Sequence, residues 1–189
     1  FCALTFDDGY ASIFENAMPL MEKYQHKATV FLTVGADGDL MEMSGRQMLN
    51  WEQIRELHQM GYEIGAHTET HPDLRQISDA QLIKEIINPK KIIEDKLGDA
   101  VTTFAYPFGY YDKRSAEMVS EHYDYAVTTE LRYAKMTDEH NLLPRLETYY
   151  LRPKVCQSLM GSEYLPAYMA MRALPRALRQ RFTSNAENK

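Results

Sequence analysis

The chain has 189 residues, of which 44% are hydrophobic and 25% are charged, and its formal net charge is -6 at pH 7. This composition is that of an ordinary globular domain and excludes a long disordered chain, and one domain of this length buries a sizeable core. The negative charge argues against a nucleic-acid partner, because nucleic-acid-binding proteins usually present a basic surface. A neutral substrate fits this charge better.

The two cysteines, Cys2 and Cys156, lie far apart in the sequence and define no disulfide framework. The sequence contains no apolar run of about 18 residues, the length that predicts a membrane-spanning helix, and no signal-peptide pattern. It begins at Phe1, without a methionine and already inside an apolar segment. We therefore expect a fragment or processed form of a longer protein, truncated on its N-terminal side.

Strand-like and helix-like segments alternate along the chain. The strands that we predict are residues 1–6, 28–34, 62–66, 101–105, 125–128 and 142–151. The helices that we predict between them are residues 12–24, 51–60, 78–97 and 112–122. Because parallel strands need crossover connections that are usually helical, the alternation predicts an α/β fold with a largely parallel sheet or barrel and outer helices.

Local signals place several helix boundaries. Ser12 and Glu15 have the spacing of a capping box, and Asn50 is a suitable N-cap for the second helix. Pro89 interrupts the helix predicted at residues 78–97. Since an interior proline costs about 3 kcal/mol, we expect a kink near this position or two helices in place of one.

The end of the chain differs in character. Residues 164–182 contain four arginines and no acidic residue, with apolar side chains at helical spacing. The simplest interpretation is a helix that packs on the domain, and the alternative is a helix that contacts a membrane surface or a partner protein. We therefore divide the chain into a main domain, residues 1–150, and a helical, arginine-rich C-terminal extension, residues 151–189.

Chemically reactive residues follow three of the predicted strands. Asp7 and Asp8 follow the first strand, His67 and His71 follow the third, and Phe108 follows the fourth within a Pro-Phe-Gly sequence. An Asp-Asp-Gly sequence alone is equally typical of a polar turn. However, the carboxyl ends of strands in parallel α/β folds converge on one crevice where ligands bind. We therefore expect these residues to meet there.

The residues at these strand ends have the composition of a catalytic metal site. Two imidazoles and one carboxylate leave coordination positions open for water and substrate, and His67 and His71 would share one side of a helical turn. The segment is not a zincin motif, because Thr68 and not glutamate follows His67. The second carboxylate would act as the base that deprotonates water on the metal. The pattern therefore predicts a metallohydrolase.

Three segments carry a family resemblance. TFDDGY from Thr5, HTETHPDL from His67 and FAYPFGYYD from Phe104 occur in this order, and they resemble the first three motifs of the polysaccharide deacetylases, the NodB homology domain of carbohydrate esterase family 4. The resemblance extends from Leu4 to about Tyr150. It implies a distorted (β/α) barrel with about seven parallel strands and outer helices, fewer strands than the standard barrel has.

The resemblance also implies roles for individual residues. Asp7 matches the catalytic base, and Asp8, His67 and His71 match the ligands of a divalent metal ion, usually zinc, with cobalt or nickel as alternatives. Phe108 matches the position whose backbone N–H stabilises the oxyanion. The implied reaction removes N-acetyl groups from an N-acetylated polysaccharide, such as poly-N-acetylglucosamine, peptidoglycan or a chitin-like glycan. The implied location is extracytoplasmic, in the periplasm, in the cell envelope or secreted.

Two positions depart from the family pattern. Ala105 stands where many members carry an arginine that orders the catalytic aspartate. A subgroup that resembles the biofilm poly-N-acetylglucosamine deacetylases also reads FAYP and lacks this arginine, so Ala105 indicates a subtype. Arg145 would then orient Asp7 from another strand. No Leu-x-His motif follows Tyr125. His140, the only later histidine, would be the general acid, unless Asp7 returns its own proton to the amine.

Aromatic residues near the motifs are candidates for sugar contacts, because flat apolar rings suit the C–H faces of sugars. We predict substrate-binding roles for Tyr10, Tyr106 and Tyr110, and we expect Trp51 to be packed in the domain. Two other functions stay open. The same fold would serve an O-acetyl esterase or a hydrolase of small cyclic amides, and the two departures would also fit a catalytically silent glycan-binding domain.

Overall fold

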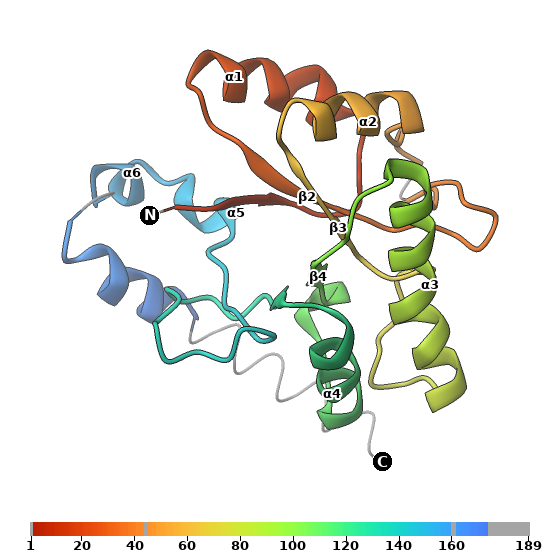
Figure 1. Ribbon diagram of the computed structural model, residues 1–189. Coiled ribbons are helices and arrows are strands. Elements are labelled where there is room, and N and C mark those ends of the chain that lie inside the picture. The colour runs from red at the N-terminus through yellow and green to blue at the C-terminus, as the bar shows by residue number, and fades with distance from the viewer. Residues whose placement is uncertain (1, 44, 160–161, 174–189) are drawn as a thin grey trace.

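The computed structural model describes residues 2–43, 45–159 and 162–173 (Figure 1). In this part of the chain, one parallel sheet has five strands in the order of the sequence. The strands are β1 (Leu4–Phe6), β2 (Ala28–Leu32), β3 (Glu63–Ala66), β4 (Thr103–Ala105) and β5 (Tyr125–Val127). The helical segments are η1 (Ile13–Ala17), α1 (Met18–Lys23), α2 (Trp51–Gln59), α3 (Asp79–Leu97), η2 (Pro107–Gly109), α4 (Lys113–His122), α5 (Thr148–Leu151) and α6 (Lys154–Leu159).

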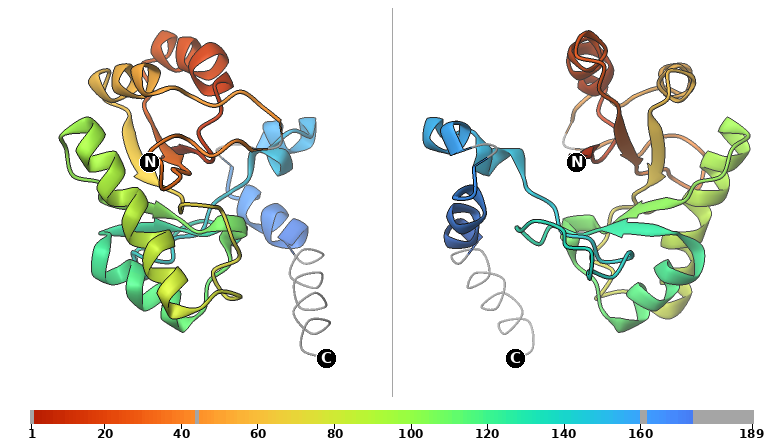
Figure 2. Two further views of the ribbon diagram at one scale, coloured as in Figure 1. Left: turned by 90° about the vertical axis from the view of Figure 1, so that its right-hand side faces the viewer. Right: turned by 60° about the vertical axis from the view of Figure 1, so that its left-hand side comes forward.

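The sheet curls into a half-barrel with helices α1 to α4 along its outer side (Figures 1 and 2). Neighbouring strands pair in parallel, for example Thr5 with Thr29 and Val30 with Ile64. The prediction of a parallel α/β fold with outer helices is therefore confirmed. The predicted number of about seven strands is wrong for the described residues, in which the sheet has five.

The main core lies between the sheet and the outer helices. Val30, Phe31 and Leu32 in β2 are almost fully buried, as expected for a central parallel strand that is covered on both faces. The helices contribute side chains from their inner faces, among them Leu57 of α2 and Ile86 of α3. This packing fixes the strand ends, which carry the reactive residues.

Caps are predicted at two helix starts, and the structure confirms one of them. Asn50 and Gln53 exchange both hydrogen bonds of a capping box at the start of α2. Ser12 makes no side-chain cap, and residues 13–17 form a π-helical turn in place of the first α-helical turn. The predicted capping box at Ser12 is therefore wrong.

Helix α3 continues through its proline, so the alternative of two separate helices is wrong. Pro89 provides no N–H for the carbonyl of Glu85, four residues earlier. Two contacts compensate for this weakened turn. The ring of Pro89 is buried, and the Tyr123 hydroxyl donates a hydrogen bond of 2.6 Å to the carbonyl of Ile86.

The sixth predicted strand, residues 142–151, is also wrong. Only Leu143 forms a parallel bridge, to Val127, and residues 148–151 form the short helix α5. The chain continues beside β5 without forming a strand, since the Arg145 N–H donates to the carbonyl of Glu130. The Arg145 side chain reaches the first strand, where it donates to the hydroxyl of Thr5.

A second, smaller apolar cluster lies beside the half-barrel, where the C-terminal helices pack together (Figure 2). Its buried members are Leu131, Cys156, Leu165 and Met169. Residues 165–173 are helical. Three of the four arginines of residues 164–182, and with them the predicted contact to a membrane or partner, fall outside the described residues. No helix in the described ranges is long and apolar enough to span a bilayer.

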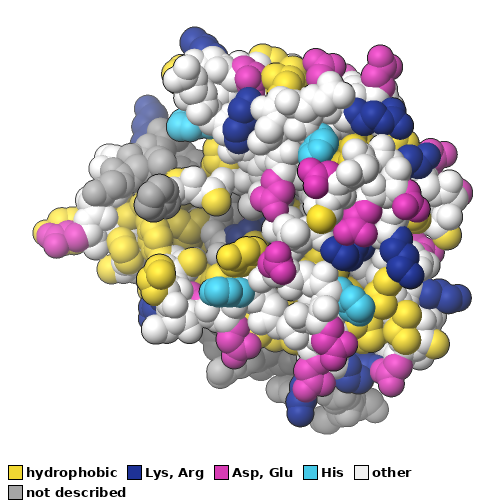
Figure 3. All heavy atoms as spheres, in the orientation of Figure 1, with side chains coloured by type: hydrophobic (Ala, Val, Ile, Leu, Met, Phe, Trp, Pro, Cys, Tyr) yellow, Lys and Arg dark blue, Asp and Glu magenta, His cyan; other side chains and the backbone are white. Residues whose placement is uncertain are grey.

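The surface in Figure 3 mixes acidic and basic side chains over the outer helices. Hydrophobic side chains gather in the same view over the C-terminal helices, where Tyr149, Tyr164 and Met171 are exposed.

Candidate active site

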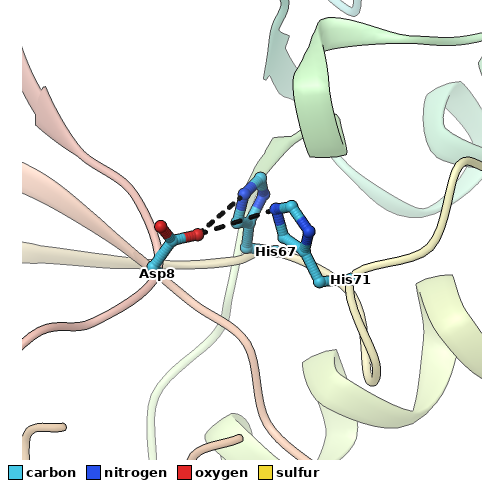
Figure 4. A group of neighbouring side chains, drawn as sticks. All are labelled: Asp8, His67 and His71. Atoms are coloured by element: carbon cyan, nitrogen blue, oxygen red, sulfur yellow. Dashed lines mark ion pairs between the residues drawn. The ribbon is translucent and has the colours of Figure 1, made fainter. Parts of the chain in front are cut away.

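Three side chains converge at the carboxyl ends of β1 and β3 (Figure 4). The Oδ1 atom of Asp8 lies 3.5 Å from Nε2 of His67 and 3.6 Å from Nε2 of His71. All three potential ligand atoms lie within 4.8 Å of one another. The residues that the strand-end argument grouped together are therefore neighbours in space.

This donor set fits a divalent metal ion. Tetrahedral zinc with bonds of about 2.0–2.1 Å places its ligand atoms roughly 3.3 Å apart, close to the separations of 3.5 Å and 3.6 Å between Asp8 and the two histidines. His67 is also prepared for coordination, because its Nδ1 atom lies 2.7 Å from the carbonyl oxygen of Ala105. A carbonyl only accepts, so Nδ1 carries the proton and the Nε2 lone pair is free for a metal.

The two histidines meet through a loop and not through the helical turn that we predicted. Thr68 and His71 both have left-handed backbone conformations, with φ angles of 70° and 56°. The chain therefore turns twice between the ligands, and the imidazole rings meet edge to face with centroids 4.9 Å apart. The His71 N–H donates to the Thr68 hydroxyl, which closes this loop.

The electrostatic surroundings keep His71 neutral. Burial lowers the pKa of His71, and the neighbouring His67 lowers it further, although Asp8 and Asp7 act in the opposite direction. A neutral imidazole has the lone pair that a metal ion needs. The environment of His71 therefore favours the form that binds metal.

Asp7 lies beside this group and is held by Arg145. The guanidinium donates to both carboxylate oxygens, at 2.6 Å and 2.8 Å, and it also donates to the carbonyl of Thr128 and the hydroxyl of Thr5. Burial raises the pKa of Asp7, but the bidentate contact with Arg145 outweighs burial and lowers it overall. Asp7 is thus an ionised carboxylate of fixed orientation.

Phe108 lies on the other side of the two histidines. Its backbone has a φ angle of 59°, and its ring meets the His71 ring edge to face at 4.6 Å. The following Gly109 is required, because a Cβ atom there would lie 2.1 Å from the Thr129 hydroxyl and because φ is +72°. Thr129 also donates to the carbonyl of Phe108, so the turn is firmly held.

The sequence profile described as polysaccharide deacetylase matches residues 1–127. The chain belongs to this family. The Bacillus subtilis protein named "Putative polysaccharide deacetylase YxkH" is 31% identical over 128 residues, which are 67% of this chain and 44% of YxkH. A Staphylococcus aureus poly-beta-1,6-N-acetyl-D-glucosamine N-deacetylase is 25% identical over 171 residues, 86% of this chain and 56% of that protein.

Solved structures of deacetylases share the fold. The Streptococcus pyogenes deacetylase PplD, in complex with acetate, superposes with a TM-score of 0.70 at 30% identity, covering 76% of this chain and 62% of PplD. The chain thus spans about half the length of the curated relatives that it matches.

In this deacetylase-family chain, contacts between aromatic rings lead from His71 through Phe108 to Tyr110. The Tyr110 ring lies 5.9 Å from the Phe108 ring, and the Arg75 guanidinium covers Tyr110 at 4.0 Å while pairing with Asp73. Tyr10 lies under the guanidinium of Arg46. Trp51 donates to the carbonyl of Gly38 and is part of the packed domain, as expected.

Two cavities lie near these residues, and Thr129 lines both of them. One, of about 360 Å³, is lined by residues of β1 and of the 145–149 segment, including Asp7 and Arg145. The other, of about 270 Å³, is lined by Arg75, Tyr110 and Tyr111, among others. Open space therefore adjoins both Asp7 and Tyr110.

Two predicted site residues are not brought to this site. Tyr106 is fully buried, and its ring packs against Phe104 and Tyr111, so it has no surface to offer a sugar. The ring of His140 packs on Tyr125, at the amino-terminal start of β5, whereas the reactive residues follow the carboxyl ends of the strands. We therefore retain neither as a candidate for substrate contact or proton transfer.

Glu85 was not among the residues predicted for the site. This residue is 8% exposed on the inner face of α3, and its carboxylate binds the loop between His67 and His71. A signal was available in the sequence, because a glutamate directly preceding Ile86 and three residues after Leu82 falls on the apolar face of the predicted helix.

Proposed function

We propose that this chain carries the catalytic site of a metal-dependent hydrolase that removes N-acetyl groups from an N-acetylated polysaccharide. The observation that carries the proposal is an Asp-His-His group beside a second aspartate that is held by an arginine. Asp8, His67 and His71 would hold the ion, with zinc as the first candidate and cobalt or nickel as alternatives. When bound, the ion polarises the acetyl carbonyl and lowers the pKa of water.

Asp7 is the proposed general base. Its lowered pKa keeps it ionised at neutral pH, so it can accept the proton of the attacking water. Arg145 fixes the plane of the carboxylate and compensates its charge. Because His140 lies elsewhere, we propose that Asp7 afterwards gives the same proton to the departing amine.

The backbone N–H of Phe108 is the proposed donor to the oxyanion. The left-handed backbone at Phe108 and the hydrogen bond from Thr129 hold the turn rigid. A preorganised donor of this kind is typically worth about 3–4 kcal/mol of transition-state stabilisation.

The proposed substrate is an N-acetylated glycan that contacts Tyr10 and Tyr110. The two neighbouring cavities, one lined by Asp7 and the other by Tyr110, support a chain of sugars more than a single small ligand. Poly-N-acetylglucosamine is favoured among such glycans because an S. aureus relative is named for that substrate. Acetate, which is present in the PplD complex, is the product that such a reaction releases.

Location and domain limits are part of the same proposal. A polymer of the cell envelope or matrix requires an extracytoplasmic enzyme, in the periplasm, in the envelope or secreted. We also propose that residues 1–150 form the deacetylase domain, somewhat more than the 1–127 that match the family profile, and that residues 151–189 form an extension.

The decisive experiment measures acetate release from N-acetylglucosamine oligomers by chelated protein, before and after addition of zinc, cobalt or nickel. We expect metal-restored activity, and we expect it to be absent from Asp7→Asn and from His71→Ala. Asp7→Asn should retain stoichiometric metal, whereas His71→Ala should lose it.

The same assay separates the competing functions. Preferential release from acetylated xylan would indicate an O-acetyl esterase, and turnover of small cyclic amides alone would indicate the other hydrolase. Stoichiometric metal binding with no turnover of any of these substrates would overturn the deacetylase proposal in favour of a glycan-binding domain.

A further inference from the structure

A buried carboxylate holds the loop that separates the two histidines. The Oε2 atom of Glu85 accepts hydrogen bonds from the backbone N–H groups of Glu69 and Thr70, both at 2.9 Å. Its Oε1 atom accepts a third hydrogen bond, of 2.6 Å, from the Thr70 hydroxyl. Three donors from two consecutive residues thus converge on one side chain of α3.

The two halves of this loop are anchored differently. His67 is tied to β2 and β4, because its N–H donates to the carbonyl of Leu32 and its ring donates to the carbonyl of Ala105. Beyond Thr68, the hydrogen bonds to a neighbouring element come from α3, where Asn88 adds a bond to the Glu69 side chain. The half that carries His71 therefore depends on α3.

The backbone conformation of the loop explains why hydrogen bonds to Glu85 are needed. Thr68 and His71 are both left-handed, and such conformations cost of order 1–3 kcal/mol each unless the surroundings stabilise them. Hydrogen bonds to an ionised acceptor are stronger than neutral ones. The carboxylate of Glu85 lies between the two left-handed residues, where it can offset this cost.

We propose that Glu85 is a positioning residue for the metal site: it holds the 69–70 backbone and thereby keeps His71 within reach of the ion that His67 and Asp8 share. This inference rests on the proposed metal-dependent function. Glu85 contacts neither the metal nor the substrate in this proposal. Glu85 acts only through the loop of residues 69–70.

The test compares Glu85→Gln with a matched control on the same helix, Asp95→Asn. Asp95 is exposed, so the control removes one carboxylate from α3 without touching the loop. Thr70→Val removes only the hydroxyl donor and serves as a graded variant. The readouts are zinc affinity by competition with a chromophoric chelator, the Tm of the metal-free protein, and amide hydrogen exchange of residues 68–71.

We expect Glu85→Gln to weaken zinc binding by about 10–100-fold, the range seen when a supporting residue of a metal site is changed. Thr70→Val should weaken it less, and Asp95→Asn should match the unmodified chain. Glu85→Gln should also speed hydrogen exchange at Glu69 and Thr70, while the metal-free protein still unfolds cooperatively.

Each outcome decides the matter. Zinc affinity within twofold of the unmodified chain, or unchanged protection of the Glu69 and Thr70 amides, would overturn the assignment. Hydrogen exchange is measured on the metal-free protein, so it tests the role of Glu85 even if the unmodified chain binds no zinc. Absence of zinc binding by the unmodified chain would count against the proposed function instead. If Glu85→Gln fails to fold, Thr70→Val decides. Unchanged zinc affinity of Thr70→Val would overturn the proposal, and weaker zinc binding would support it.

Discussion

Asp7 and Arg145 illustrate how one pair of side chains can set both the charge and the orientation of a reactive group. A bidentate contact fixes the plane of the carboxylate as well as its position. Arg145 is itself held by Thr128 and Thr5, so it approaches Asp7 in one orientation. In this chain, where Ala105 offers no side-chain donor, the arginine comes from a distant part of the sequence.

Replacing Arg145 should therefore impair turnover without removing the metal. We expect Arg145→Ala to lower kcat by about 10–100-fold, the effect typical of residues that orient a reactive group. Arg145→Lys should recover only part of the loss, since an ammonium cannot make the bidentate contact. Acetate release measures the effect, and zinc affinity is the control that should not change. Unaltered kcat in Arg145→Ala would remove the proposed role.

Metal binding by the three ligands should be visible as stability. A ligand that binds only the folded state at 100 times its Kd adds about 2.7 kcal/mol to the free energy of unfolding. We expect zinc to raise the Tm of the chelated chain and to leave that of His71→Ala unchanged. Magnesium, which prefers oxygen ligands, is the matched control. An equal Tm increase in His71→Ala would place the stabilising ion elsewhere.

At the scale of elements, helix starts and the predicted sixth strand show which features local sequence predicts and which it does not. The capping box at Asn50 and Gln53 follows from the sequence alone. Ser12, with equally good spacing, makes no side-chain cap, and residues 13–17 form a π-helical turn that local spacing does not reveal. The predicted strand at 142–151 also fails, because only Leu143 forms a bridge and residues 148–151 are helical.

The site itself was more predictable than these elements. Asp7, Asp8, His67 and His71 all follow strand ends, and the topology of parallel sheets alone predicts that such residues meet. Glu85 could not be assigned in this way, because its partners are backbone N–H groups, and their direction depends on the left-handed residues of the loop. Tyr106 differs again, because its position next to a motif does not reveal that its ring points into the core.

The N-cap of α4 makes stability depend on pH. Asp112 accepts a hydrogen bond from the N–H of Ser115 and pairs with Arg114. Burial raises the pKa of Asp112, but these contacts outweigh it and lower the pKa below the ordinary value of 3.8. A depressed pKa means that the cap stabilises the fold above the unfolded-state pKa, and that this contribution is lost as pH falls through the folded-state pKa.

We therefore expect Asp112→Ala to lower the free energy of unfolding by about 1 kcal/mol at pH 7. The difference from the unmodified chain should shrink as the pH falls below about 4, where the carboxylate becomes protonated. Urea unfolding across this range measures it. Asp112→Asn keeps a capping oxygen, so its smaller deficit at neutral pH is the control, and a deficit of Asp112→Ala that grows toward acid would contradict the prediction.

Gly65 in β3 marks a close approach of three strands. A Cβ atom there would lie 2.6 Å from both the Phe31 ring and the Thr103 hydroxyl. We expect Gly65→Ala to destabilise the fold by about 1–3 kcal/mol through overpacking, as measured by urea unfolding. Gly98→Ala is the control for backbone strain. A Cβ atom at this position meets open space, but φ is +73°, so any loss of stability there comes from strain and not from crowding. Equal stability of Gly65→Ala and the unmodified chain would refute the crowding.

At the scale of the whole molecule, the described residues form two apolar clusters of unequal size. The larger one lies between the sheet and its outer helices, and the smaller one lies around Leu131. Regions with fewer buried contacts open at a lower free-energy cost than the main core. We therefore expect the C-terminal helices to open without unfolding the half-barrel.

The two cysteines allow this opening to be measured, because Cys2 is exposed and Cys156 is buried in the smaller cluster. In a Cys2→Ser background, a thiol reagent should label Cys156 only when that cluster opens. Leu131→Ala should accelerate labelling by creating a cavity there, while zinc affinity stays unchanged. Val119→Ala, in the larger cluster, is the matched control, and faster Cys156 labelling in this variant as well would show that the two clusters open together.

Asp7 and Arg145 are paired in the fold but are synthesised at very different times, since 138 positions separate them in the sequence. The three metal ligands, and the Ala105 carbonyl that orients His67, are all synthesised before Arg145. On the proposed function, a nascent chain at that stage would have the groups that hold the ion but not the residue that orients the base. Full turnover would then depend on the arrival of the segment that carries Arg145, which contacts Asp7.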